Sequence, residues 1–221
     1  MTIEFRPWPK TPRFNRDVII TEKIDGTNAA IIIEESENPH DAPPASELPG
    51  AIARVVFDGD GPPDFEGSGV FFVGAQSRKR LIVPGDDNFG FAAWVAEHAE
   101  DLVRALGPGR HFGEWWGSGI QRGYDQPKGV KRFSLFNVDR YEAGPDLRVG
   151  ELEGLEVVPT LYRGPLHDGA LHDVELRLRN NGSKAQAGFM RPEGYVIFHS
   201  AANQVFKVLL EGDDTHKGDQ A

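Results

Sequence analysis

Short runs of β-branched and aromatic residues, separated by residues that favour turns, dominate this chain of 221 residues. Such runs are typical of strands. They predict strands over residues 18–24, 29–34, 52–57, 70–75, 110–115, 133–139, 157–162, 195–199 and 204–210. The strands outnumber the expected helices and do not alternate with them regularly. We therefore expect an α+β fold of largely antiparallel sheets with flanking helices, and not a doubly wound parallel sheet.

Two segments have the apolar spacing of an amphipathic helix. Residues 89–106 form the clearer one, with Asn88 available to cap its start and Gly107-Pro108 to end it. Residues 170–180 form the weaker one. The sequence predicts a single helix over each segment.

Length and composition limit the protein class. The chain fits one domain or at most two small ones, and because it has no long linker we expect a single domain over 1–221. It has no cysteine, which excludes disulfides, thiolate zinc sites and a cysteine nucleophile. Residues 1–14 lack the apolar core of a signal peptide, and no apolar run is long enough for a membrane span. These features predict a soluble cytoplasmic protein that does not act in a membrane.

The charge pattern argues against a protein that coats nucleic acid non-specifically, because the formal net charge is −10. Cations nevertheless gather in two clusters. These are Arg78, Lys79 and Arg80, and Arg122, Lys128, Lys131 and Arg132. Either cluster could be ordinary solvated surface or part of a basic cleft.

The most informative segment surrounds Lys23. This lysine ends an apolar strand and is followed at once by a turn-forming stretch, residues 25–28. Partial burial favours the neutral amine, which is the nucleophilic form. Gly26 would let the backbone approach a ligand closely, and Asn28 could orient a phosphate or a ribose. The alternative is a plain hairpin whose lysine points outward.

The same segment resembles motif I of the covalent nucleotidyltransferases, which comprise ATP- and NAD-dependent DNA ligases, RNA ligases and mRNA capping enzymes. Further segments resemble the later motifs of that superfamily in the correct order. After Lys23-Ile24-Asp25-Gly26-Thr27-Asn28 come Ser77-Arg78 (motif Ia), Phe112-Gly113-Glu114-Trp115 (motif III), Phe133-Ser134-Leu135-Phe136-Asn137-Val138 (motif IIIa), Glu193-Gly194-Tyr195-Val196-Ile197 (motif IV) and Val205-Phe206-Lys207 (motif V). The Gly-Thr-Asn after the lysine and the compact length look most like the RNA ligase 2-like branch.

The resemblance implies a nucleotidyltransferase (adenylation) domain and an ATP-dependent enzyme. In that family the lysine attacks the α-phosphorus of ATP and retains AMP. The AMP then moves to an RNA 5′-phosphate, and a 3′-hydroxyl displaces it. A Mg²⁺ ion, for which Mn²⁺ could substitute, is expected to bridge the phosphates and assist the leaving group.

The resemblance also implies a role for each matching residue. Lys23 would be the nucleophile, and Lys207 and Arg78 would be cations that neutralise the phosphates. Glu193 would contact the metal. The expected ATP-binding residues are Glu22, Asp25, Gly26, Asn28, Glu114 (on the ribose hydroxyls), Phe136 (stacked on adenine) and Glu193. The residues alone leave alternatives open: Phe136 could be core, Glu193 a turn residue and Arg78 surface, whereas Trp115 and Trp116 are expected to pack.

Two positions depart from the family pattern. Motif V usually reads Lys-x-Lys, but here the second position is Leu209, for which Lys184 or Lys217 could substitute. Motif IIIa often ends in Phe-Asp, but here it ends in Phe136-Asn137. The chain also leaves no room for the OB domain of DNA ligases and capping enzymes.

Three functions follow. The first is an RNA ligase that joins nicked or single-stranded RNA ends, with the second basic cluster and Tyr124 guiding the RNA. The second is a related nucleotidyltransferase with another acceptor, such as a minimal DNA ligase. The third is a non-catalytic module that binds ATP or RNA ends. A partner protein could supply substrate binding.

Overall fold

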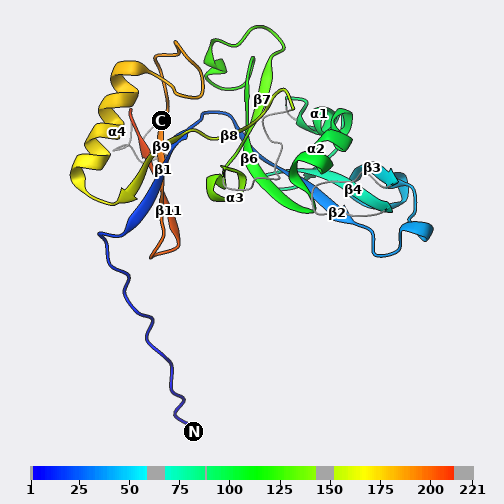
Figure 1. The fold of residues 1–221 in the computed structure, drawn as a ribbon, viewed down its shortest axis with the longest axis horizontal. Helices are drawn as coiled ribbons and strands as arrows, with labels where there is room; N and C mark the ends of the chain where they lie inside the picture. The colour runs from blue at the N-terminus through cyan, green and yellow to red at the C-terminus, as the bar shows by residue number, and fades with distance from the viewer. Residues whose placement is uncertain (1, 59–67, 88, 143–151, 212–221) are drawn as a thin grey trace, which may run out of the picture. The chain divides into compact units, whose positions relative to one another are not determined.

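The computed structural model describes residues 2–58, 68–87, 89–142 and 152–211. The chain divides into two compact units, one formed by residues 1–23 with 159–221 and the other by residues 24–158. Each unit is built on a sheet of its own (Figure 1). That the whole chain acts as a single nucleotidyltransferase domain stays a prediction. Among the described residues, no helix is both long and apolar enough to cross a bilayer.

The first unit is a four-stranded antiparallel sheet covered on one face by a helix. In the order β11-β10-β1-β9, its strands are Gln204–Leu209, Gly194–His199, Asp17–Lys23 and Thr160–Pro165. The helix is α4, Asp168–Asn181, which buries Val174 and Leu178 against Val18 and Ile20. Side chains alternate along a strand, so the odd-numbered residues of β1 lie on the face opposite α4.

The second unit is a seven-stranded sheet. In the order β3-β4-β2-β6-β7-β8, its strands are Ala51–Asp58, Ser68–Ser77, Thr27–Glu35, Gly109–Gly117, Lys131–Leu135 and Leu155–Val157, and β5, Leu81–Ile82, pairs with β4. Among the described pairings of this sheet only β7–β8 is parallel. The prediction of an α+β fold with largely antiparallel sheets is therefore confirmed.

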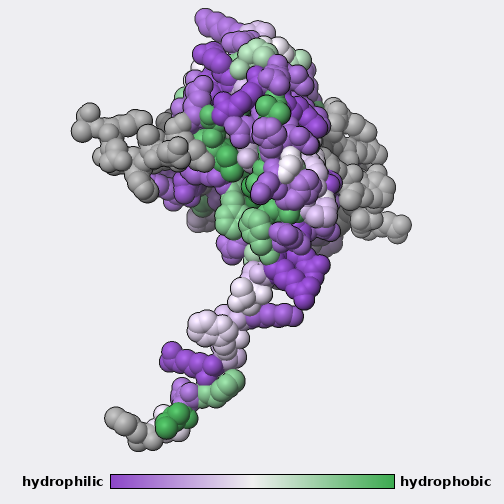
Figure 2. All heavy atoms as spheres, turned by 90° about the vertical axis from the view of Figure 1, so that its left-hand side faces the viewer, coloured by the Kyte–Doolittle hydropathy of each residue, from purple (hydrophilic) through white to green (hydrophobic). Residues whose placement is uncertain are grey.

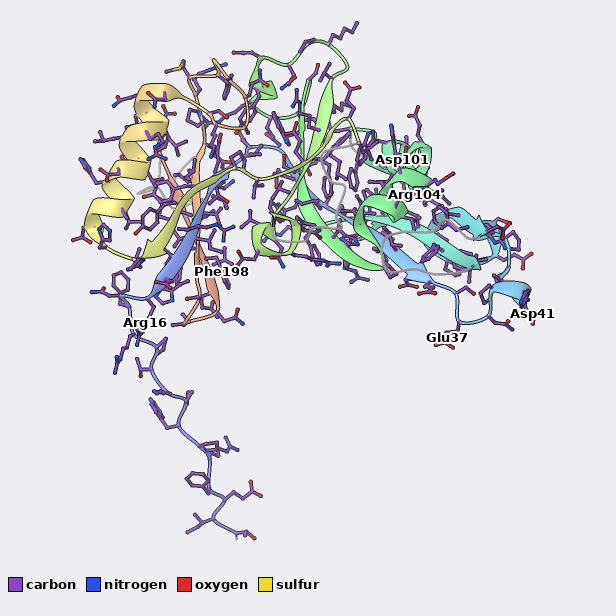
Figure 3. All side chains as sticks on the ribbon, in the orientation of Figure 1. Arg16, Glu37, Asp41, Asp101, Arg104 and Phe198 are labelled. Carbon is purple, nitrogen blue, oxygen red and sulfur yellow. The ribbon has the colours of Figure 1, made fainter. Side chains whose placement is uncertain are left out.

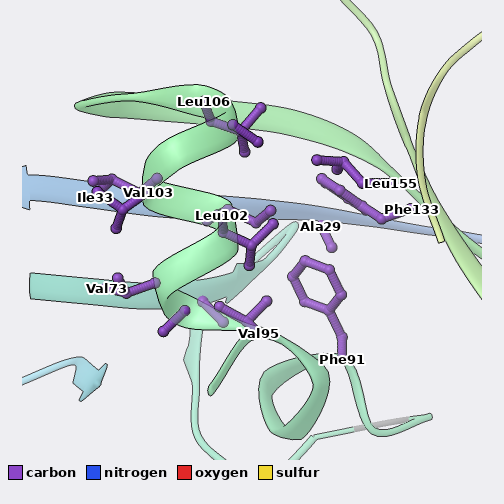
Figure 4. Packing of buried hydrophobic residues seen from close by; sticks show 14 of the residues in the cluster. Ala29, Ile33, Val73, Phe91, Val95, Leu102, Val103, Leu106, Phe133 and Leu155 are labelled. Atoms are coloured by element: carbon purple, nitrogen blue, oxygen red, sulfur yellow. The ribbon is translucent and has the colours of Figure 1, made fainter. Parts of the chain in front are cut away.

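Two short helices cover one face of this second sheet. They are α1, Phe91–Glu97, and α2, Ala99–Leu106. Figure 4 shows Phe91, Val95 and Leu102 of these helices packed beside the strands, where Ala29 contributes to the same apolar cluster. The odd-numbered residues of β2 face the helices, and the even-numbered ones lie on the other face, which we call the open face. The remaining elements are α3, Val138–Glu142, and the short turns η1, Pro39–Asp41, η2, Ala45–Glu47, and η3, Gly123–Asp125.

The structure corrects two strand predictions. The predicted strand over residues 157–162 is two strands, β8 and β9, in different sheets. Pro159 lies between them and has no N–H to donate to a ladder. The predicted strand over 133–139 ends at Leu135. Asn137 then begins α3, because its side-chain oxygen accepts a hydrogen bond from the Arg140 N–H at 3.3 Å.

The single helix predicted over 89–106 is also wrong, because it breaks at His98 between α1 and α2. His98 leaves helical geometry, with φ −105° and ψ 20°. The backbone hydrogen bonds nevertheless continue, because the His98 N–H donates to the Trp94 carbonyl at 3.1 Å and the Leu102 N–H donates to the His98 carbonyl at 2.9 Å. The His98 ring bonds to the same Trp94 carbonyl through Nδ1 at 2.9 Å. The predicted cap Asn88 lies outside the described residues. Asp87 serves instead, because its carboxylate accepts a hydrogen bond from the Ala92 N–H at 2.6 Å. The weaker predicted helix is present as α4.

Candidate active site

Lys23 ends β1 beside a glutamate from the neighbouring strand. The β1–β10 register sets Lys23 opposite Gly194, so Glu193 lies at the point where β10 begins. The Lys23 Nζ is 2.5 Å from Glu193 Oε2, and the two side chains are 24% and 16% exposed. The amine is therefore half-buried and paired with a carboxylate, and does not point into open water. Because β1 and β2 belong to different sheets, the plain-hairpin alternative is excluded.

The sheet register places Lys207 on the same face as Lys23. Gly194 pairs with Lys23 on one side and with Leu209 on the other, so Leu209 is directly in line with the amine. Lys207 lies two residues before Leu209 on β11, on the same face, and is exposed. Strand spacing and rise put its Cα about 12 Å from that of Lys23, within reach of a triphosphate but outside direct contact.

The Glu22 side chain lies on the opposite face, next to the turn that follows α4. It is 1% exposed and accepts hydrogen bonds from the Ser183 hydroxyl at 2.5 Å, the Lys184 N–H at 2.7 Å and the Ala185 N–H at 2.9 Å. Burial raises the pKa of Glu22, and these donors together with the Lys184 charge oppose the shift. Its predicted role in ATP binding stays a prediction, but the carboxylate itself holds this turn.

Asp25, Gly26 and Asn28 belong to the second unit, where they lie against β6. Asn28 is opposite Glu114, whose carboxylate accepts hydrogen bonds from the Gly26 N–H at 3.1 Å and the Asn28 amide at 2.7 Å. A side chain at Gly26 would overlap the Trp115 carbonyl and come within 2.8 Å of the Trp116 Cβ. Glycine is therefore required at position 26 because the backbone passes close to β6 there.

Asp25 is fixed from both its backbone and its side chain. Its N–H donates to the Tyr124 hydroxyl at 2.9 Å, and its carboxylate pairs with the Arg122 Nε at 3.0 Å. Tyr124 is 0% exposed, so the expectation that it could stack on a base is wrong. Trp115 and Trp116 are buried, at 2% and 0%, as expected for packing residues.

The second basic cluster is largely committed within the unit. Arg122 pairs with Asp25, and Arg132 pairs with Glu156. Lys131 donates to the Phe89 carbonyl at 2.5 Å. Three of the four cations that were expected to guide RNA therefore make local contacts within the unit.

The open face of the second unit presents a row of polar and aromatic groups. Ser77 is the last residue of β4 and lies opposite Ala29 on β2. Arg78 follows in the bend that leads to β5, where the Ser77 N–H donates to the Arg80 carbonyl at 2.8 Å. Arg78 is exposed, in keeping with a group that meets a ligand or simply solvent. Phe136 is 41% exposed and its N–H donates to the Phe112 carbonyl at 3.0 Å, so the alternative that Phe136 is core is excluded.

A single carboxylate, Glu193, is the metal ligand that the sequence predicts. Within the described ranges no group of three or more His, Cys, Asp or Glu side chains could hold a metal ion. Mg²⁺ commonly binds through one or two carboxylates together with substrate phosphates and waters, so one glutamate on the Lys23 face fits a phosphate-bound ion. It does not fit a metal held by protein groups alone.

Comparison with known proteins adds the family to this geometry. The family model described as RNA ligase matches residues 16–209, which include every motif from Lys23 to Lys207. The chain belongs to the RNA ligase family. Among curated proteins, none matches significantly.

Solved structures of an RNA ligase resemble the chain at low identity. A lysine-to-alanine variant of Naegleria gruberi RNA ligase, with ATP and Mn, is 16% identical, has a TM-score of 0.49 and covers 89% of this chain and 50% of its own. An arginine-to-alanine variant, also with ATP and Mn, is 19% identical, has a TM-score of 0.43 and covers 90% of this chain and 51% of its own. This chain spans about half the length of these proteins.

The structure shows where the two residues that depart from the motif pattern of the RNA ligase family lie. Leu209 takes the place in line with Lys23. Of its two candidate substitutes, Lys184 donates to the Thr160 carbonyl at 2.9 Å, and Lys217 lies outside the described residues. Asn137 caps α3, a role that asparagine and aspartate fill equally well.

One residue of the open face escaped the sequence argument. Phe112 is 50% exposed, although it lies in the middle of β6 between the buried residues His111 and Gly113. It gives Phe136 an apolar neighbour through their shared backbone hydrogen bond. The signal was available, because a large aromatic on the polar side of an alternating strand is an exposed apolar group that invites a ligand.

Proposed function

We propose that this chain is an ATP-dependent RNA ligase that works through a lysyl-AMP on Lys23 and joins 5′-phosphate to 3′-hydroxyl ends. The observation that carries the proposal is the half-buried ion pair between Lys23 and Glu193 at the end of β1. A lysine in this position, two residues before the Asp-Gly-Thr-Asn stretch, is suited to be a nucleophile rather than a solvated surface charge.

Three steps complete the reaction. The Lys23 Nζ forms a bond to the α-phosphorus of ATP while the bond to pyrophosphate breaks, and the amine loses its proton. An oxygen of the RNA 5′-phosphate then displaces the amine from AMP. Finally, a 3′-hydroxyl attacks that 5′-phosphate, loses its proton and releases AMP.

The residues of this chain would position the groups that react. The Lys23 ammonium must pass its proton to water and separate from Glu193 before the amine can attack, since a protonated amine has no lone pair to donate. Glu193 would then hold Mg²⁺ or Mn²⁺, directly or through water, and the metal would neutralise the phosphates and ease the departure of pyrophosphate. Lys207 and Arg78 would add positive charge, Glu114 and Asn28 would meet the ribose, and Phe136 would stack on adenine. The binding roles of Glu22, Asp25 and Gly26 and the cytoplasmic location stay predictions.

The deciding experiment is labelling with α-³²P-ATP and Mg²⁺. We expect a label that survives denaturation, resists alkali and is released by acid, as a phosphoramidate would be. Lys23→Ala should abolish the label, whereas Lys79→Ala, at an exposed lysine, should retain it. Glu193→Gln should slow labelling about 10- to 100-fold and make it need more Mg²⁺. An unlabelled parent protein under every divalent metal would instead favour the non-catalytic ATP- or RNA-end-binding module.

The acceptor requires its own comparison. Nicked RNA, nicked DNA and single-stranded RNA, each with a 5′-phosphate, should be offered to the labelled protein. Transfer of AMP to RNA ends and sealing of RNA would support the ligase. Transfer to DNA alone would make the chain a minimal DNA ligase. Sealing that appears only after another protein is added would support a partner that supplies substrate binding.

A further inference from the structure

A basic and aromatic arm precedes β1, and the proposed reaction does not use it. Residues 2–13 lie in no helix or strand and are exposed throughout. Phe5 is 89% exposed, Trp8 90% and Phe14 66%. Figure 2 shows hydrophilic and apolar residues interspersed along this arm. Three large aromatic side chains left in water on one short segment are unusual for a soluble protein and indicate a binding surface.

The charge of the arm is opposite to that of the chain. Residues 2–16 hold four cations and a single carboxylate, whereas the chain has a formal net charge of −10. The cations are Arg6, Lys10, Arg13 and Arg16. Each aromatic residue has a cation within two positions in sequence. Cations that track a phosphate backbone, combined with aromatic rings on which bases stack, are what proteins use to bind single-stranded nucleic acid.

Prolines give this arm an extended form. Pro7, Pro9 and Pro12 fix their own backbone angle and turn the preceding residues away from helix. In a polyproline II conformation, residues three apart share a face. That spacing puts Phe5 and Trp8 on one edge and places Lys10 and Arg13 along the next edge, up to the bend at residues 14–16.

The foot of the arm is anchored to the first unit. The Phe14 carbonyl accepts a hydrogen bond from the His199 ring at 2.7 Å, and the Arg16 carbonyl accepts one from the Leu166 N–H at 2.9 Å. Figure 3 labels Arg16 at this foot, next to β1, the strand that ends in Lys23. Whatever the arm holds is therefore tethered to the strand that bears the nucleophile.

We propose that residues 2–16 bind a single-stranded stretch of the RNA to be joined. The inference rests on the proposed function for its ligand and adds the substrate class: RNA with an unpaired run, not a continuous duplex interrupted by a nick. Bases inside a duplex are already stacked on each other and cannot stack on Phe5 and Trp8.

Binding can be measured without ATP, so that no reaction intervenes. The probes are a fluorescein-labelled, 5′-phosphorylated single-stranded RNA 12-mer and the same strand in a duplex, read by anisotropy. The double variant Phe5→Ala/Trp8→Ala should weaken binding of the single strand by about tenfold or more. The matched control is Val56→Ala/Leu81→Ala, at apolar residues of the second unit that are 48% and 49% exposed. This control should bind as the parent does.

The charges and the tryptophan give two independent readouts. The variant Arg6→Gln/Lys10→Gln/Arg13→Gln should reduce the slope of log affinity against log salt by about 2. The single strand should also protect the exposed Trp8 from quenching by iodide. Equal binding of strand and duplex, parent-like affinity of both arm variants, or capture of a protein by the arm with RNA binding unchanged would each overturn the proposal.

Labelling by ATP separates this inference from the proposed function. Lysyl-AMP formation needs no RNA, so both arm variants should be labelled at the parent rate. An unlabelled parent that still binds RNA through the arm would defeat the ligase proposal alone. If the parent is labelled normally and both arm variants bind RNA as tightly as the parent does, the arm proposal alone would be wrong.

Discussion

Lys23 and Leu209 together define the charge around the proposed nucleophile. Lys23 has one carboxylate partner, Glu193, and its in-line neighbour two strands away is the apolar Leu209. The cation of that strand, Lys207, lies two residues before Leu209. A triphosphate bound over this face would therefore meet fewer positive charges than the Lys-x-Lys pattern of the family provides.

Leu209→Lys restores the second motif V lysine. We expect the KM for ATP in lysyl-AMP formation to fall about tenfold, because a charge-assisted hydrogen bond to a phosphate is worth on the order of 1.5–3 kcal/mol. Labelling rates at increasing ATP concentrations measure this. Val205→Lys is the control, since Val205 is on the same strand and face, 64% exposed and further from Lys23. Equal effects of the two substitutions would mean that added charge acts without regard to position.

At the level of elements, sequence reasoning succeeded where a pattern is local. The short runs of β-branched and aromatic residues that became β2 and β10 could be recognised because each run and the turn residues beside it span only a few positions. The break at His98 lies in the backbone angles of that one residue, φ −105° and ψ 20°, and no periodicity shows this. The separation of β8 from β9 depends on which sheet each strand joins, and tertiary structure determines this.

The candidate site, too, has features that the sequence predicts and features that depend on tertiary structure. The motif residues could be found from their order along the chain. Their neighbours within each unit could not, because strand register sets Leu209 in line with Lys23 in the first unit and Glu114 opposite Asn28 in the second. Tyr124 was assigned to RNA because a tyrosine among cations favours that reading, yet its hydroxyl serves the backbone of Asp25.

The turn after α4 gives a prediction about an element. Glu22 is its main acceptor, so Glu22→Ala should lower the free energy of unfolding by about 3 kcal/mol, because three donors lose one buried carboxylate. Ser183→Ala removes one of these donors, together with the oxygen that accepts from the Gln186 N–H at 3.0 Å, and should cost about 1–2 kcal/mol. Urea unfolding followed by far-UV circular dichroism measures both. Similar losses for the two variants would show that the backbone N–H groups of Lys184 and Ala185 do not depend on Glu22.

The two units give the whole molecule two separately built cores, and each holds a buried group whose shifted pKa matters on acidification, Glu22 in the first and His111 in the second. In the first unit burial raises the pKa of Glu22. In the second unit burial lowers the pKa of His111 to about 4, helped by the Arg140 charge and opposed by the hydrogen bond to the Gly107 carbonyl. The folded chain thus holds a proton more tightly than the unfolded chain at one site and less tightly at the other. These two sites therefore act on stability in opposite directions as pH falls.

His111 gives the clearer dependence on pH. Its folded pKa of about 4 lies below the ordinary value of 6.5, so on acidification the unfolded chain takes up the proton first. The contribution of His111 to the free energy of unfolding is therefore complete above pH 6.5 and falls between pH 6.5 and 4, by up to about 3 kcal/mol. His111→Gln keeps a side chain that can hydrogen-bond with the Tyr141 hydroxyl and the Gly107 carbonyl but cannot titrate. It should be less stable at pH 7 and should lose less stability down to pH 4.

Urea unfolding of the parent and of this variant at half-unit pH steps tests the argument. Burial raises the pKa of Glu22 equally in the parent and in the variant, and this acts on stability in the direction opposite to His111. The effect of Glu22 therefore cancels when the two free energies of unfolding are subtracted. That difference should shrink steadily from pH 6.5 to pH 4, because only the parent has a buried imidazole to protonate. A difference that stays constant over this range would mean that the His111 ring takes up its proton equally well in the folded and unfolded chains.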